Sequence, residues 1–111
     1  MRVDNAAVTT STPRSASIDP QSLYQLLDPL LMIPSMGGTA AESAAQWHVA
    51  EMLTTMGLEV HTWDMSIDDL ADQPDFPGME VERTEGVGVL GIWRGTGERP
   101  ALMINGHTDV V

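Results

Sequence analysis

The stretch from residue 39 to residue 65 constrains the fold of this chain more than any other. Apolar side chains recur at helical spacing over positions 45, 49, 52, 53 and 56, which predicts a helix over 40–56 with one apolar face. Thr39 and Glu42 have the spacing of a capping box at its start, and Gly57 is the residue expected to end it. Alternating side chains over 58–65 then predict a strand. A helix that leads directly into a strand favours an α/β sandwich.

Other segments extend this pattern in both directions. Leucines at spacings of three and four predict a helix over 20–33, with Ser17 or Asp19 as its cap and a kink or early end at Pro29. Residues 1–17 are rich in Ser, Thr and Ala without periodicity, so we expect a disordered tail there and one partial domain over 18–111.

The region from residue 66 to residue 85 is strongly acidic. Ser66 is placed to cap a short helix over 67–71, and prolines and glycines then oppose regular structure. The carboxylates lack the spacing of a calcium-binding EF-hand loop. A solvated acidic loop is the interpretation that the sequence favours.

Residues 86–91 match the dinucleotide-binding pattern G-x-G-x-x-G letter for letter. That fingerprint must follow a strand and open a helix, whereas these glycines lie inside an apolar run followed by turn residues. We therefore predict a strand over 87–93 whose glycines allow close packing, and no dinucleotide site. It is expected to form an antiparallel hairpin with a second strand over 101–105, which is apolar without alternation and so predicted to be buried on both faces.

His107 and Asp109 follow that last apolar run at a spacing of two. Residues i and i+2 of an extended backbone point to the same side, so both side chains can face one point beyond the strand. Neutral imidazole is a common zinc ligand, and a neighbouring carboxylate can fix its tautomer. The chain has no cysteine, so a metal here takes nitrogen and oxygen ligands. His48 and His61 are expected to be structural.

Leu102 to Val111, reading LMINGHTDVV, resembles the first metal motif of the zinc-dependent amidohydrolases related to acetylornithine deacetylase, succinyl-diaminopimelate desuccinylase, aminoacylase and glutamate carboxypeptidase. Ile33-Pro34-Ser35 is similar to the end of that family's first helix, and Pro74–Glu80 resembles an insertion of some deacetylase-like members, compatible with a lip near the active site. The resemblance covers about residues 20–111.

This resemblance implies that His107 is a metal ligand and that Asp109 is the catalytic-site residue that orients it. It also implies the N-terminal portion of a helix-sheet-helix sandwich with a mixed sheet. Members cleave the amide bond of N-acyl amino acids or small peptides, usually with two zinc ions, Co and Mn being the alternatives, and some form homodimers. Their remaining ligands follow this motif, so we expect an N-terminal fragment of such an enzyme, without turnover on its own.

Charge separates this expectation from other function classes. The net charge is −11, and Arg is the only basic residue type besides His, which argues against binding to nucleic acid or to anionic membrane surfaces. No apolar run approaches 18 residues and no secretory signal is present, so we expect a cytoplasmic protein. The alternative function is a small acidic, non-catalytic α/β interaction module in which the His-x-Asp pattern is incidental.

Overall fold

The computed structural model describes residues 17–97 and 101–110. These ranges form a small mixed α/β protein, as the sequence predicts, with three helices and a two-stranded antiparallel sheet. In chain order the elements are α1 (Pro20–Leu31), α2 (Ala40–Thr55), β1 (Glu59–Asp64), α3 (Ile67–Ala71) and β2 (Val87–Ile92). The predicted tail lies outside the described residues up to position 16. No helix in the described ranges is long and apolar enough to cross a membrane.

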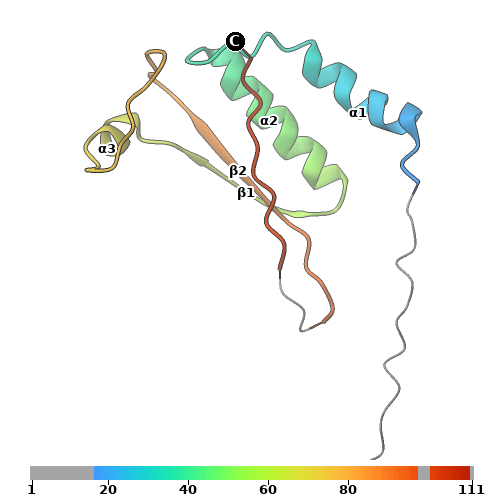
Figure 1. The fold of residues 1–111 in the computed structure, drawn as a ribbon. Helices are drawn as coiled ribbons and strands as arrows, with labels where there is room; N and C mark the ends of the chain where they lie inside the picture. The colour runs from blue at the N-terminus through green and yellow to red at the C-terminus, as the bar shows by residue number, and fades with distance from the viewer. Residues whose placement is uncertain (1–16, 98–100, 111) are drawn as a thin grey trace, which may run out of the picture.

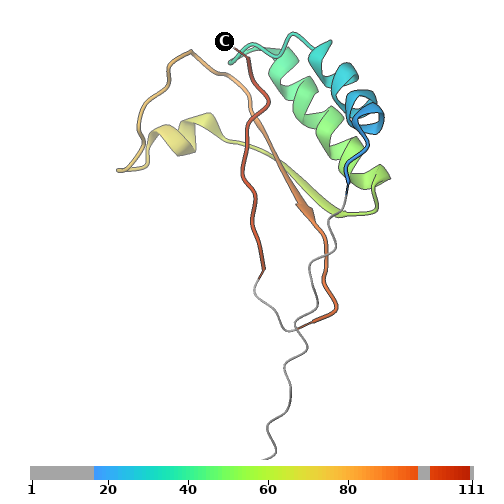
Figure 2. The ribbon, with the colours of Figure 1, turned by 45° about the vertical axis from the view of Figure 1, so that its right-hand side comes forward.

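Helix α1 begins with a proline and is capped by the residue before it. The carboxylate of Asp19 accepts hydrogen bonds from the backbone N–H groups of Gln21 and Ser22, at 3.3 and 3.0 Å. The helix continues through Pro29 and ends at Leu31, two residues before the end of the predicted range 20–33. No residue of α1 is buried, and the helix lies alongside α2 (Figures 1 and 2).

Helix α2 is the long helix predicted from the apolar stripe, but the predicted capping box is wrong in its details. The side chain of Thr39 makes no cap hydrogen bond, because its hydroxyl donates instead to the carbonyl of Met36, at 2.6 Å. Glu42 does reach back, and its Oε2 accepts from the N–H of Gly38 at 2.7 Å. The Glu42 carboxylate therefore binds the N–H of Gly38, one residue before the Thr39 N–H that a capping box predicts. Gly57 follows the helix with φ of +86°, as expected for a left-handed terminator.

Strands β1 and β2 pair antiparallel, with Trp63 opposite Gly88 in the register. A β-carbon on Gly88 would lie 2.1 Å from Cε2 of Trp63, so the indole occupies the space that any side chain at 88 would need. The G-x-G-x-x-G residues thus lie within and beside a strand, and the prediction of a strand with close packing at its glycines is confirmed. Helix α2 covers one face of this sheet (Figure 1).

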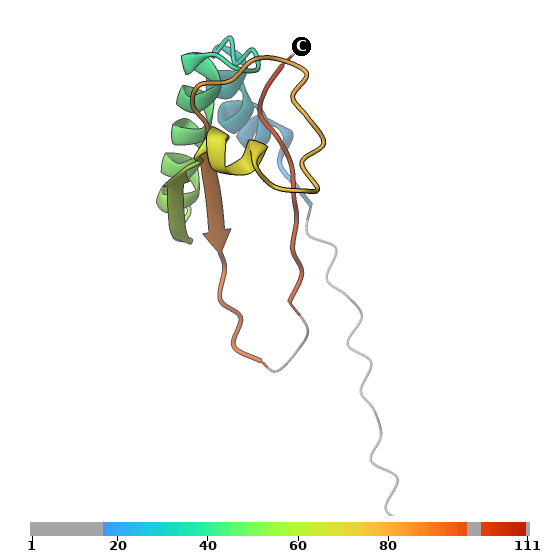
Figure 3. The ribbon, with the colours of Figure 1, turned by 90° about the vertical axis from the view of Figure 1, so that its left-hand side faces the viewer.

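The strand predicted over residues 101–105 is absent from the structure, which corrects that prediction. Leu102, Met103 and Ile104 are 85%, 80% and 86% exposed, and β2 pairs with β1 instead. The segment runs apart from the sheet and reaches the N-terminal end of α2 (Figure 3). A strand buried on both faces needs a paired edge and two covering layers, and α2 is the only described helix that contacts the sheet.

Candidate functional site

The His-x-Asp pair forms the contact that its spacing predicts. Nδ1 of His107 lies 3.0 Å from Oδ1 of Asp109. The imidazole is 82% exposed and the carboxylate side chain 28% exposed. An Nδ1–H that donates to the carboxylate leaves the lone pair of Nε2 free and facing outward, which is the tautomer that a metal ligand requires.

Thr108, between these two residues, is held from two directions. The hydroxyl of Ser35 donates to the Thr108 carbonyl at 2.7 Å, and the Ser35 carbonyl accepts from the N–H of Val110 at 2.9 Å. On α2, Nε2 of Gln46 donates to the Thr108 hydroxyl at 3.0 Å. Ser35 is only 2% exposed, so its hydroxyl is committed to this contact. These bonds fix the backbone on which His107 and Asp109 are carried. Sequence reasoning did not identify Gln46 in this role.

Arg83 joins the acidic loop to the start of α2. Its Nη1 forms an ion pair with Oε1 of Glu42, the residue whose other oxygen accepts from Gly38. The hydrogen bond to Glu42 is the main cause that raises the pKa of Arg83 above its ordinary value, and the negative charge of Asp109 adds to it. A lone arginine among carboxylates was the only signal in the sequence that could have found this link.

The turn at Gly37 and Gly38 brings this loop beside Asp109. A β-carbon on Gly37 would lie 3.3 Å from Nη2 of Arg83 and 3.7 Å from Oδ2 of Asp109, so both groups border the same small space. Gly38 has φ of +78°, and a β-carbon there would lie 2.4 Å from the carbonyl oxygen of Glu82. Only glycine fits that position. The acidic loop therefore borders the candidate site.

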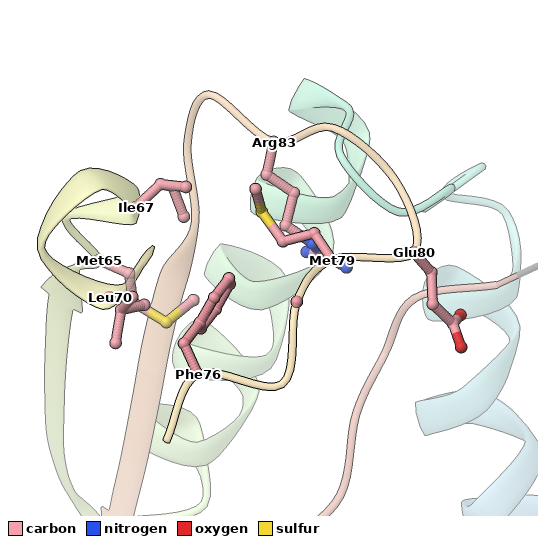
Figure 4. A pocket seen from close by; sticks show the side chains of 8 residues that line it. Met65, Ile67, Leu70, Phe76, Met79, Glu80 and Arg83 are labelled. Carbon is pink, nitrogen blue, oxygen red and sulfur yellow. The ribbon is translucent and has the colours of Figure 1, made fainter. Parts of the chain in front are cut away.

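The loop is held in this place by its own apolar side chains. Figure 4 shows Phe76 directed toward Met65 and Leu70, while the carboxylate of Glu80 points away from that cluster. The loop residues before Met79 and those after it therefore contact different parts of the molecule. Those before it pack toward α3, and those after it lie near Gly37 and Asp109.

A hollow of about 370 Å³ opens at this junction. Its walls are Met36, Gly37, Glu80, Val81, Arg83, Asp109 and Val110. The hollow is formed by the turn before α2, the acidic loop and the His-x-Asp segment, which are distant in sequence. It is therefore a property of the fold that no local pattern could predict.

His61 shows that a His–carboxylate contact alone does not define a metal site. Its Nε2 lies 3.0 Å from Oε1 of Glu59, also two residues away. Glu59 accepts in addition from Arg94, at 2.7 and 3.0 Å, and these hydrogen bonds, followed by that of His61, lower the pKa of Glu59. His48 lies half-buried on α2, and its buried Nε2 has no hydrogen-bond partner among the described residues.

One histidine with an orienting carboxylate fits one position of a metal site. A catalytic zinc normally takes three protein ligands. Within residues 17–97 and 101–110, no group of three or more His, Cys, Asp or Glu residues could hold a metal ion. The described residues thus bring together His107 and Asp109 but no complete set of metal donors. No protein-family model, curated protein or solved structure matches this chain.

Proposed function

We propose that this chain carries the first metal-binding motif of a zinc-dependent amidohydrolase that cleaves N-acyl amino acids or small peptides. One observation carries the proposal. Ser35, from the Ile-Pro-Ser segment, donates to the backbone between His107 and Asp109. The two segments on which the family resemblance rests are 73 residues apart in sequence and meet in space at the candidate ligand. The helix-sheet-helix sandwich with a mixed sheet, which the resemblance implies, belongs to this proposal.

Each residue of the pair has a distinct part. His107 offers Nε2 to the metal, and its exposure leaves room for further ligands. Asp109 accepts the Nδ1–H, which orients the ring and raises the basicity of the coordinating nitrogen. When bound, the metal polarises the substrate carbonyl and lowers the pKa of a coordinated water towards neutrality. Ser35 and Gln46 keep the intervening backbone in place.

The proposal includes a set of donors beyond this pair. A second zinc ion, a general base and the remaining carboxylate and histidine ligands are implied by the resemblance and are required for turnover. We accordingly propose that the isolated chain has no activity, and that the intact enzyme acts on its small-molecule substrate as a homodimer. Cobalt or manganese can take the place of zinc in sites made of nitrogen and oxygen donors.

The experiment compares two histidines in the intact protein, by which we mean the complete enzyme that this proposal assumes. His107→Ala is expected to lower zinc content and to abolish hydrolysis of a panel of N-acyl amino acids. His61→Ala is the matched control, since His61 also contacts a carboxylate two residues away at 3.0 Å. It should keep the zinc content and turnover of the unaltered protein. Full zinc occupancy and turnover in His107→Ala, or equal losses in both variants, would contradict the proposal.

The alternative of a non-catalytic interaction module is favoured by one observation. Leu102, Met103 and Ile104 form a contiguous apolar segment that is at least 80% exposed at each residue. Exposed apolar patches of this kind mark interaction surfaces. The module would fold stably, bind no zinc through His107 and hydrolyse no N-acyl amino acid, so the histidine comparison also separates the two functions.

A further inference from the structure

The hollow beside Asp109 combines apolar walls with unbalanced negative charge. Met36, Val81 and Val110 supply aliphatic and thioether surface. Glu80 and Asp109 supply carboxylates. The hollow has room for a short aliphatic group and adjoins the candidate metal ligand through Asp109. A group bound in it would thus lie near the reacting bond of a substrate held at His107.

Arg83 offsets this charge only in part, since its guanidinium lies near Asp109 but is bound to another carboxylate. Although it lines the hollow, its guanidinium is paired with Glu42, which lies outside the lining. Glu80 makes no ion pair among the described residues, and Figure 4 shows its carboxylate directed away from the apolar cluster under the loop. Arg83 and Glu42 together contribute no net charge, while Glu80 and Asp109 contribute two negative charges. Among the described residues, a substrate carboxylate entering here would meet two carboxylates and one guanidinium that is already paired with Glu42.

We infer that this hollow is the specificity subsite of the proposed hydrolase and takes a short aliphatic group of the substrate, while excluding groups that carry a carboxylate. The inference rests on the proposed function and deepens it. It places the acidic loop, through Glu80 and Val81, in control of substrate choice. The enzyme is then a hydrolase of acylamino acids whose group in the hollow is uncharged, and substrates with a succinyl or glutamate carboxylate at that place are poor.

Matched substrate pairs test this in the intact protein. N-butyryl-leucine has a methyl group at the end of its acyl chain, where N-succinyl-leucine has a carboxylate. N-acetyl-norvaline and N-acetyl-glutamate differ in the same way at the side chain. In the pair whose variable group enters the hollow, kcat/KM should favour the member with the methyl group over the member with the extra carboxylate by about tenfold or more. Equal kcat/KM within both pairs, or preference for the acidic members, would overturn the inference.

A second test reverses the charge of one residue that lines the hollow. Glu80→Arg should raise kcat/KM for the member with the extra carboxylate by about tenfold relative to the member with the methyl group. Asp75→Arg is the matched control, because it makes the same charge change in the same loop at an exposed residue outside the hollow. It should leave the ratio unchanged. The same shift in both variants would show a general field effect and overturn the assignment to the hollow.

A binding measurement separates failure of the subsite from failure of the proposed function. Methyl signals of Val81 and Val110 are followed by NMR while N-butyrylglycine or N-succinylglycine is added. Shifts with the butyryl compound alone support the subsite, even if no substrate is cleaved and the proposed function fails. Turnover that depends on His107, combined with no methyl shifts and no effect of Glu80→Arg, overturns the subsite and leaves the proposed function standing.

Discussion

At the scale of single residues, similar contacts have different surroundings. His107 and His61 each meet a carboxylate two residues away at 3.0 Å. Glu59 already accepts hydrogen bonds from Arg94 on the neighbouring segment. Asp109 borders a hollow and lies near a cation that is paired elsewhere. The contact is thus common, and the setting of Asp109 is what distinguishes the candidate site.

Replacing Asp109 by asparagine removes its charge and preserves its shape. Asp109→Asn should lower zinc affinity or activity of the intact protein by about 10–100-fold, because the amide holds the His107 ring less firmly and raises its basicity less. Glu59→Gln makes the same change beside His61 and should have no such effect. Zinc titration and steady-state kinetics measure both. An Asp109→Asn protein that binds zinc and turns over substrate like the unaltered one would contradict the role given to Asp109.

At the scale of elements, three segments meet at Thr108. The segment before α2 supplies Ser35, α2 supplies Gln46, and the last described segment supplies the residue that they hold. The contact between Ser35 and Thr108 spans 73 residues of sequence. Local patterns predict each segment, yet the backbone geometry at the candidate ligand depends on their meeting.

Ser35→Ala should therefore disturb both stability and the site. It removes a buried hydroxyl that donates to the Thr108 carbonyl, which costs about 1 kcal/mol in unfolding free energy and loosens the His107 backbone. Ser43→Ala is the matched control, since that exposed hydroxyl only contacts Glu85, at 3.2 Å. Denaturant unfolding and zinc titration measure the effects. Equal behaviour of the two variants would argue against the proposed hold on Thr108.

Elements with a strong local signal could be predicted from the sequence. The helix over 40–56, the strand over 58–65 and the strand over 87–93 differ from α2, β1 and β2 by no more than one residue at either end. The strand over 101–105 was wrong because apolar composition predicts a need for burial and not the presence of a covering layer. Arg83 was missed for a related reason. Its ion pair with Glu42 joins residues 41 positions apart.

At the scale of the whole molecule, packing contacts and backbone hydrogen bonds are unevenly distributed along the chain. Helix α2 and the two strands share the main packing contacts, whereas the apolar segment at 102–104 is exposed. Among the described residues from 101 onward, the first backbone–backbone hydrogen bond is that of Val110, whose N–H donates to the Ser35 carbonyl. The candidate site thus lies at the attached end of a segment whose other end is open to solvent.

Amide hydrogen exchange should reproduce this distribution. Amides of residues 102–104 are expected to exchange rapidly, because they are exposed and unpaired in the described structure. The cross-strand amides of β1 and β2 and the amide of Val110 should be protected, since each donates to a backbone carbonyl. Exchange is followed residue by residue by NMR. Protection of 102–104 equal to that of β2 would show that the segment is a paired strand after all.

The central claim is that His107 binds metal through Nε2 while Nδ1–H donates to Asp109. Nitrogen-15 NMR of the histidine rings, recorded on the intact protein while zinc is added, tests it without any assay of turnover. We predict that the Nε2 signal of His107 moves to a metal-bound position, that its Nδ1 stays protonated, and that His61 does not respond. A His107 ring that is unchanged at saturating zinc, or that responds no more than His61, would contradict the account.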